Sequence, residues 1–542
     1  MEQSDPNWFQ RTIFYELSVQ SFFDSNGDGI GDLTGLTSKL DYFVELGVGC
    51  LWLIPFFQSP MRDGGYDISD YRQVNPTLGT IEDFRELLAE AHRRGLKILI
   101  DLVMNHTSDA HPWFQAARQD RNSPYHDYYV WSETDQKYAD ARIIFLDTEK
   151  SNWAWNEATH EFYWHRFYSH QPDLNYDNPA VLEEMLGIID FWLAMGIDGL
   201  RVDAVPYLIE REGTNCENLP ETHAILKKVR AFVDEHYPGR VLVCEANQWP
   251  RDVVQYLGEG DEFQMAFNFP LMPRIFMALR QEDAAPIRWA MEQLPEIPDS
   301  CQWGTFLRNH DELTLEMVTE EERQYMWAEY APLPGQRLNL GIRRRLAPLL
   351  DNDPRRITLA HALLFSLPGS PFLYYGDEIG MGDNINLFDR NGLRTPMQWN
   401  GGKNAGFSSA ERPVEAVIDN DEFPKAKINV VAEQADPNSL WHTLHRMMVL
   451  RQAHVELAGH AFRWIDCADK RALAFERPGA GQGIVAVHNL RREALSLSLP
   501  LTQVGVKSLT DLFSGGQFTP QGGALKIELA PSQSMWLKYH LS

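Results

Sequence analysis

The stretch Gly199-Leu-Arg-Val-Asp203-Ala204 is a short apolar run that ends at a carboxylate, and three more stretches combine apolar residues and acids similarly. They are Asp101-Leu-Val-Met-Asn-His106, Val241-Leu-Val-Cys-Glu245 and Thr305-Phe-Leu-Arg-Asn-His-Asp311. Carboxylates at the C-terminal ends of parallel strands converge on one face of a (β/α)8 barrel, where the active sites of that fold lie. An acid cluster without a thiol or serine nucleophile beside it is typical of glycosidic-bond chemistry. The four stretches therefore predict a barrel that acts on sugars.

Composition limits the class of protein further. A chain of 542 residues, 44% of them hydrophobic, is long enough for a large barrel and at least one further module. The formal net charge of −27 argues against nucleic acid or an anionic membrane as a partner. The acidic N-terminus lacks the features of a signal peptide, and no apolar run is long enough to span a membrane. The five cysteines form no CxxC pair, so we expect reduced thiols in a cytoplasmic protein.

Strand and helix patterns alternate along most of the chain. Residues 13–19, 50–56 and 97–103 read as strands, with amphipathic helical stretches at 36–46 and 81–94. Such alternation implies right-handed βαβ units with a parallel sheet. Beyond this region, five further strands end at Phe269, Glu378 and the acids Asp203, Glu245 and Asp311. The count of eight predicts an α/β fold of the TIM-barrel type.

Changes in pattern divide the chain into three parts. Residues 1–106 and 179–457 are expected to form the barrel, with a helical, arginine-rich insert at 319–357. Residues 107–178, rich in aromatic and polar side chains, are expected to form an irregular insertion after the third strand, acting as a wall or lid. Residues 458–542 contain period-two runs separated by turn residues, which predict a C-terminal antiparallel β-sandwich.

Asp203 and Glu245 are predicted to be neighbours because they end the fourth and fifth strands. Retaining glycoside chemistry needs two carboxyl groups about 5–5.5 Å apart, one nucleophile and one proton shuttle. Arg201, two residues before Asp203 on the same strand face, is expected to keep Asp203 ionised. Partial burial is expected to raise the pKa of Glu245. The alternative for any single acid is a helix cap, which four strand ends in this order disfavour.

The same stretches resemble the conserved regions of the α-amylase family of glycoside hydrolases (GH13). Gln171-Pro-Asp-Leu-Asn175 resembles a fifth region of that family. The resemblance implies a retaining double displacement, with Asp203 as nucleophile, Glu245 as acid/base and Asp311 as transition-state stabiliser. It also implies a sugar pocket that uses His106, His310, Asp63, Tyr66 and Arg394. A pair between Asp63 and Arg394 is expected to close this pocket behind one glucose unit, so that a disaccharide fits.

Within the family, four stretches resemble the trehalose synthases, which are maltose α-D-glucosyltransferases. They are residues 205–213, 245–250, 310–317 and 337–348. The resemblance implies that the protein is an isomerase that interconverts maltose and trehalose with minor glucose release and needs no organic cofactor. It also suggests a homodimer. One alternative is an α-glucosidase that uses the same three carboxylates. A second, from another class, is an inactive barrel that serves as an interaction subunit, which would have lost acids and gained a membrane span.

Isomerisation must exclude water from the site, so we expect a closure over it. If the segment after Asp311 is helical, Glu312 and Glu316 form an i,i+4 pair, and Arg142 from the insertion bridges to one of them. Asn247 is a further candidate for this gate. The alternative is a solvated surface pair. Arg343-Arg344-Arg345 in the insert is expected to be a solvated face.

Two structural metal sites are expected. The loop Asp24-Ser-Asn-Gly-Asp-Gly-Ile-Gly-Asp32 has oxygen ligands at alternate positions, which is typical of calcium loops. Position twelve is Gly35 and no helix precedes the loop, so it is not an EF-hand. Resemblance implies that this loop binds Ca²⁺ or Mg²⁺ through Asp24, Asn26, Asp28, the Ile30 carbonyl and Asp32. Resemblance alone implies a second calcium site, at Asn105, Asp173, Glu210 and the carbonyls of Tyr207 and Leu208. The alternative for the loop is a polar turn without metal.

Overall fold

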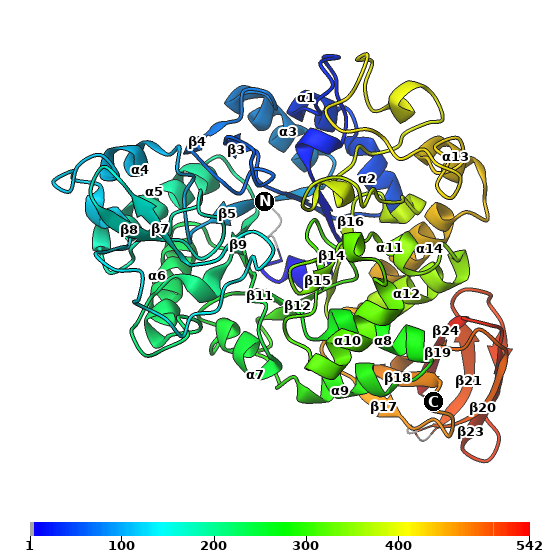
Figure 1. Cartoon of the computed structure of the whole chain (residues 1–542). Helices are drawn as coiled ribbons and strands as arrows, with labels where there is room; N and C mark the ends of the chain where they lie inside the picture. Colours follow the sequence, from blue (N-terminus) through cyan, green and yellow to red (C-terminus); the bar gives the residue numbers. More distant parts are fainter. Residues whose placement is uncertain (1–4, 502, 504, 542) are drawn as a thin grey trace.

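The computed structural model describes residues 5–501, 503 and 505–541, and its centre is a closed barrel of eight parallel strands (Figure 1). Its strands, in the order in which they pair, are β1 (Phe14–Leu17), β2 (Cys50–Leu53), β5 (Lys97–Val103), β9 (Gly199–Asp203), β10 (Val241–Cys244), β11 (Met265–Phe267), β12 (Gln302–Phe306) and β16 (Ser370–Tyr374). β16 pairs with β1 in parallel and closes the barrel. The predicted fold class is confirmed.

Helices surround the barrel and bury apolar side chains. They include α3 (Ile81–Arg93), α5 (Pro179–Ala194), α6 (Pro220–His236), α8 (Leu271–Gln281), α12 (Pro354–Ser366) and α14 (Leu440–Ala453). α3 shows the local cause: Thr80 and Asp83 form a capping box at its start, and Phe84, Leu87 and Ala91 are buried along one side.

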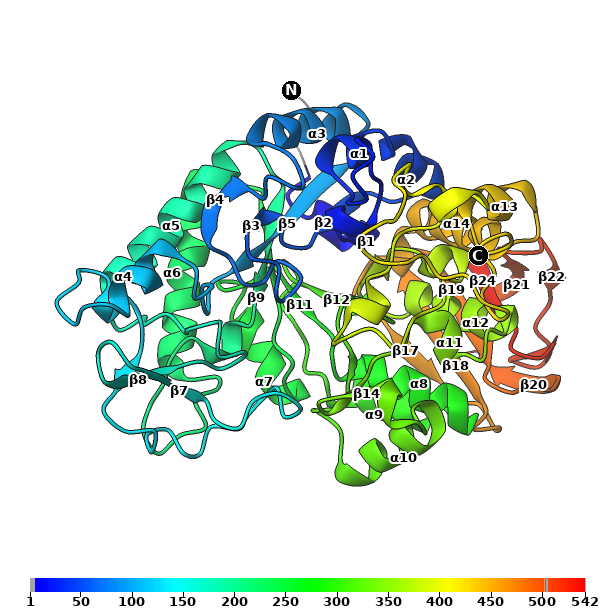
Figure 2. The same cartoon turned by 45° about the horizontal axis from the view of Figure 1, so that its top comes forward.

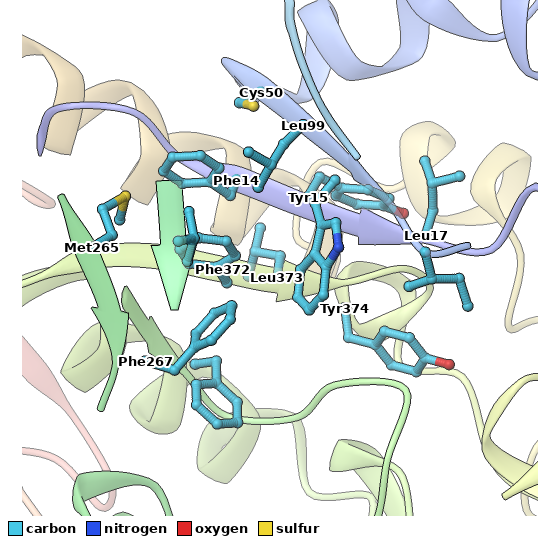
Figure 3. Close-up of a cluster of buried hydrophobic side chains, with 14 of the residues drawn as sticks. Phe14, Tyr15, Leu17, Cys50, Leu99, Met265, Phe267, Phe372, Leu373 and Tyr374 are labelled. Atoms are coloured by element: carbon cyan, nitrogen blue, oxygen red, sulfur yellow. The ribbon is translucent and has the colours of Figure 1, made fainter. Parts of the chain in front are cut away.

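Aromatic side chains fill the barrel interior (Figure 3). The rings of Phe14 and Phe372 stack with centroids 4.2 Å apart, and Phe267 packs edge-on against Phe372 at 4.8 Å. This packing makes the interior a solid core, so polar groups are left to gather at the C-terminal strand ends.

The insertion after β5 projects from one side of the barrel (Figures 1 and 2). It contains α4 (Pro112–Ala117) and a three-stranded antiparallel sheet of β6 (Trp131–Ser132), β8 (Glu161–Trp164) and β7 (Trp153–Asn156). Bridges between His106 and Asp173 and between Tyr129 and Leu174 join its two ends.

The segment after β12 differs from the expectation. Leu313–Thr314 forms β13, which pairs antiparallel with β15 (Gly341–Ile342), and β15 also pairs with β14 (Arg337–Leu338). The condition for an i,i+4 pair of Glu312 and Glu316, a helical segment, is therefore not met, because Leu313–Thr314 pairs with a distant strand. α10 (Glu320–Tyr330) begins only after Thr319.

The expectation that Arg343–Arg345 forms a solvated face is also wrong. Arg345 is only 1% exposed and donates to the Leu393 carbonyl at 2.9 Å. Arg344 pairs with Asp383 at 2.9 Å, and Arg343 donates to three backbone carbonyls of residues 385–389. The three arginines therefore anchor the polar segment 383–391.

The C-terminal part forms two antiparallel sheets, as expected. The larger contains β17 (Arg463–Ile465), β18 (Ala472–Gly479), β19 (Gln482–Asn489), β24 (Ser534–Leu541), β21 (Val506–Asp511) and β22 (Gln517–Phe518), in that order. The smaller pairs β20 (Leu495–Pro500) with β23 (Ala524–Leu529). The two sheets enclose a core of their own, with Val487, Leu499 and Leu537 fully buried in it.

All five cysteines are free, and four of them are buried. In the part of the chain that the structure describes, no helix has the length and apolar character needed to cross a membrane.

Candidate active site

Arg201 joins three carboxylates from adjacent barrel strands. Its guanidinium lies 2.7 Å from Asp203, 2.7 Å from Glu245 and 2.5 Å from Asp101. β9 pairs with β5 on one side and β10 on the other, which places the three acids around this one cation. The predicted closeness of Asp203 and Glu245, and the position of Arg201 beside Asp203, agree with this geometry.

The expectation that Arg201 keeps Asp203 ionised does not agree with the surroundings of that carboxyl group. Burial, followed by the neighbouring Glu245 carboxylate, raises the pKa of Asp203 although Arg201 opposes the shift. Arg201 cannot keep Asp203 ionised by itself because it is shared with Glu245 and Asp101. Burial and the Glu245 carboxylate thus favour the neutral form of Asp203 in the free pocket.

Asp311 also lines the pocket, beside two arginines and His310. It is 3.0 Å from Arg390, 3.2 Å from Arg394 and 3.2 Å from Nε2 of His310. Burial would raise the pKa of Asp311, but His310 and the two arginines hold it below its usual range. Asp311 is therefore an anion, which suits a group that stabilises positive charge on a sugar ring.

Asp63 closes the end of the pocket, but its partner is not the expected one. Arg390 lies 3.2 Å from Asp63, and Gln171 donates to the same carboxylate at 2.9 Å. Arg394 instead donates to the His310 carbonyl at 3.0 Å and pairs with Asp311. The predicted Asp63–Arg394 pair is thus corrected to Asp63–Arg390. Burial raises the pKa of Asp63 to about 7.

Tyr66 and His106 complete the polar wall. The Tyr66 hydroxyl donates to Asp101 at 3.0 Å, and its ring stacks on His310 with centroids 5.1 Å apart. Burial lowers the pKa of His106 to about 3, so its ring is neutral. Its Nε2 is buried and finds no partner among the described residues, which leaves it available to a sugar hydroxyl.

The pocket has a cavity volume of about 120 Å³. Sequence reasoning missed its apolar walls and two polar residues. The missed residues are Ile144, Phe145, Phe167, Tyr207, Phe269 and Arg390, which line the pocket, and Glu16, which lies behind it. The wall residues carry no pattern that separates them from core aromatics, whereas Arg390 stands in the polar stretch 389–391 and Glu16 ends the first strand.

The expected gate residues meet at the mouth. Arg142 lies 3.1 Å from Glu316 and 2.8 Å from Glu217, and it donates to the Tyr207 hydroxyl at 3.1 Å. Asn247 donates to Glu316 at 2.9 Å. The expected bridge from the insertion to the segment after Asp311 is therefore present in the structure.

Glu312 does not join this bridge. It pairs with Arg390 at 2.8 Å and accepts from Asn339 at 3.2 Å. The segment after Asp311 thus has two distinct contacts, one with Arg142 and one with Arg390.

The proposed metal ligands differ in how their oxygens are used. Asp24 accepts from the amides of Gly27 and Gly29 and from the Ser408 hydroxyl, and Asp32 caps α1 (Leu33–Thr37) through the Gly35 amide. Among the residues described, no three His, Cys, Asp or Glu side chains converge as a metal site. The side-chain oxygens of Asp24 and Asp32 thus accept hydrogen bonds from the loop, from Ser408 and from the start of α1.

At the second site three buried oxygens lack a partner within the described residues: Oδ1 of Asn105, Oδ2 of Asp173 and Oε1 of Glu210. Burial, followed by Asp173, raises the pKa of Glu210. Two buried acids and an unpartnered amide oxygen from three segments fit a hard cation such as calcium.

The closed barrel and its three strand-end carboxylates define a carbohydrate-active enzyme. A model of the α-amylase catalytic domain matches residues 17–331 and 343–459, and a model of the maltogenic amylase C-terminal domain matches residues 462–536. The chain therefore belongs to the α-amylase family.

Relatives at higher identity define the group within that family. A trehalose synthase/amylase from Mycobacterium tuberculosis is 57% identical over 92% of this chain and 85% of its own length. A trehalose synthase from Pimelobacter is 54% identical over 96% of this chain and 93% of its own. The solved trehalulose synthase from Pseudomonas mesoacidophila has a TM-score of 0.78 and 28% identity, covering 98% of this chain and 99% of its own. The chain is thus placed among the trehalose synthases.

Proposed function

We propose that the protein is an isomerase that converts the α-1,4 bond of maltose into the α,α-1,1 bond of trehalose, and back. The observation that carries the proposal is one pocket with three roles: Asp203 and Glu245 share Arg201, Asp311 lines the same pocket, and Asp63 closes the far end. Relatives named trehalose synthase at 54% and 57% identity support it.

In the first step Asp203 attacks the anomeric carbon of the bound glucosyl unit. The bond from that carbon to the bridging oxygen breaks, and Glu245 donates its proton to this oxygen. A glucosyl-enzyme on Asp203 and one free glucose result. Asp311 stabilises the positive charge that develops on the ring.

In the second step the freed glucose turns within the pocket. Its anomeric hydroxyl attacks the anomeric carbon of the glucosyl-enzyme, the ester bond to Asp203 breaks and regenerates the carboxylate, and Glu245 takes the proton of that hydroxyl. Trehalose is released with retained configuration. If water attacks instead, the enzyme is a hydrolase for that turnover and releases glucose.

The contacts at the mouth favour isomerisation over hydrolysis. Arg142 ties the insertion to Glu316, and Glu312 ties the same segment to Arg390. The first contact lies at the mouth and the second fixes a polar wall of the pocket, so together they retain glucose and limit water entry. Several-fold more trehalose than glucose is the expected product ratio.

We propose that Ca²⁺ binds at the second metal site through Asn105, Asp173, Glu210 and the carbonyls of Tyr207 and Leu208. The unpartnered oxygens support this site. The ion would supply structural charge balance between barrel and insertion and take no part in the reaction. The loop Asp24–Asp32 stays a candidate for Ca²⁺ or Mg²⁺ through Asp24, Asn26, Asp28, the Ile30 carbonyl and Asp32.

We also propose a cytoplasmic location, supported by five free thiols. The expected homodimer stays a prediction, and light scattering on the purified protein tests it.

Anomeric-proton NMR of the purified protein with maltose alone tests the reaction. Trehalose as the main product, reached also in reverse as maltose from trehalose, establishes the isomerase. Glucose as the only product makes the protein an α-glucosidase and leaves the roles of the three carboxylates intact.

A further inference from the structure

Glu16 is a buried acid behind the pocket, at the C-terminal part of β1. Only 1% of its surface is exposed. Its Oε1 lies 2.5 Å from Nδ1 of His310 and accepts from the His310 backbone amide at 3.1 Å. The two residues are 294 positions apart, so the fold alone brings them together.

The His310 ring has contacts at both nitrogens, on one face and at its edge. Its Nε2 lies 3.2 Å from Oδ2 of Asp311. Tyr66 stacks on one face with an interplanar angle of 10°, and Trp52 packs edge-on at 5.9 Å. The imidazole is therefore clamped between two carboxyl groups, Glu16 at one nitrogen and Asp311 at the other.

Both ring nitrogens of His310 face a carboxyl group. Two ionised carboxylates and a neutral ring lack one of the protons needed for a hydrogen bond at each nitrogen. A neutral imidazole has one N–H donor and one acceptor nitrogen. If Glu16 and Asp311 were both ionised, one ring nitrogen would present a lone pair to a carboxylate. Either the ring is doubly protonated or one of the acids keeps its proton.

The surroundings favour a proton on Glu16. Burial raises the pKa of Glu16, and burial lowers the pKa of His310. Asp311 is held ionised by its arginines. The charged and titratable groups that act on this pair are Arg201, Asp101, Asp311, Arg390, Arg394 and Tyr374.

We propose that Glu16 is a positioning residue that holds a proton against Nδ1 of His310, so that Nε2–H always donates toward Asp311 and the glucose hydroxyls. The inference deepens the proposed glucosyl transfer and rests on it. When Glu16 loses its proton at higher pH, the ring hydrogen moves to Nδ1 to meet the carboxylate. Nε2 then presents a lone pair to Asp311, and the sugar loses a donor.

Three variants test this role. Glu16→Gln keeps a donor for Nδ1 that cannot ionise, whereas Glu16→Ala removes it. Glu378→Gln is the matched control, because Glu378 is an equally buried acid held by the hydroxyls of Tyr15 and Tyr42, outside the pocket lining.

The substrate is an activated aryl α-glucoside, whose leaving group needs no proton from Glu245. Its release therefore reports the alkaline loss of groups other than the acid/base. We expect the alkaline fall of kcat/KM in the wild type and in Glu378→Gln to be absent or shifted upward in Glu16→Gln. Glu16→Ala should lose roughly 10–100-fold in kcat, with a smaller change in KM.

Nitrogen-15 NMR of histidine-labelled wild-type protein reads the tautomer without any variant, with His310→Asn used to assign the signal. A neutral ring protonated at Nε2 agrees with the proposal. A neutral ring protonated at Nδ1, or an alkaline limb that is the same in Glu16→Gln and the wild type, overturns it. Because the aryl glucoside assay does not require trehalose formation, failure of the isomerase proposal would be seen separately, in the maltose experiment.

Discussion

Arg201 and Arg390 are almost wholly buried, and Arg201 contacts three carboxylates whereas Arg390 contacts four, one of them its neighbour Asp389. Arg201 serves Asp101, Asp203 and Glu245, and Arg390 serves Asp63, Asp311 and Glu312. A buried carboxylate without such a partner costs several kcal/mol, so each cation stabilises a cluster that could not otherwise form. The two clusters differ in their effect on protonation: burial and the Glu245 carboxylate raise the pKa of Asp203 in the first, whereas the second keeps Asp311 an anion.

Arg142 is the residue whose removal should most directly open the mouth. Arg142→Ala deletes the contacts with Glu316, Glu217 and the Tyr207 hydroxyl. We expect released glucose to rise relative to trehalose by roughly tenfold, the change that about 1.4 kcal/mol of lost discrimination produces. Anomeric-proton NMR with maltose measures the ratio.

The control is Arg121→Ala, which removes a more exposed arginine of the same insertion that contacts Glu161. This variant should leave the ratio unchanged. An unchanged ratio in Arg142→Ala as well would show that the bridge does not exclude water.

At the scale of elements, the segment 383–391 depends on a distant arginine. Arg343 donates to the carbonyls of Ile385, Leu387 and Asp389 at 2.8–2.9 Å. Tyr168 from the insertion holds the Asp389 side chain at 2.7 Å. These contacts set the position of Arg390, which has no strand or long helix of its own to support it.

Arg343→Ala should therefore displace Arg390 in the sugar pocket, although Arg343 itself does not line the pocket. We expect kcat/KM for maltose to fall, by up to roughly 100-fold, since a shift of about 1 Å in a positioning group has that effect. The released glucose should also rise. Arg355→Ala is the matched control, because that arginine is exposed and pairs with Asp353. Equal kinetics in the two variants would contradict the positioning role.

At the scale of the whole molecule, the insertion and the barrel meet along one seam. The bridge between His106 and Asp173 lies on that seam, beside the unpartnered oxygens of Asn105 and Glu210. A cation there would offset two buried acids and hold the wall of the pocket in place.

Removal of calcium should lower the stability of the protein. A ligand that binds only the folded state adds about 2.7 kcal/mol to the free energy of unfolding when its concentration is 100 times its Kd. Calcium added back after chelation should therefore raise the Tm by a few degrees. Differential scanning fluorimetry measures the shift. Asp173→Asn should lose the gain, and Asp24→Asn separates the contribution of the first loop. A wild-type Tm that does not respond to calcium would rule out calcium binding at both proposed sites.

The sequence by itself determined the barrel and the three carboxylates. Both depend on patterns within short stretches: apolar runs make strands, and an acid at a strand end must lie on the C-terminal face of the barrel. The separate C-terminal sheets followed from period-two runs for the same reason.

Only the tertiary structure decided which groups touch. Asp63 pairs with Arg390 and not Arg394, although both arginines lie within five positions of each other, because the anchored segment orients them differently. Leu313–Thr314, after Asp311, pairs as a strand with residues 341–342 and does not form a helix. The raised pKa of Asp203 depends on burial, on the Glu245 carboxylate and on the division of one cation among three acids. These are properties of the assembled pocket rather than of any stretch of chain.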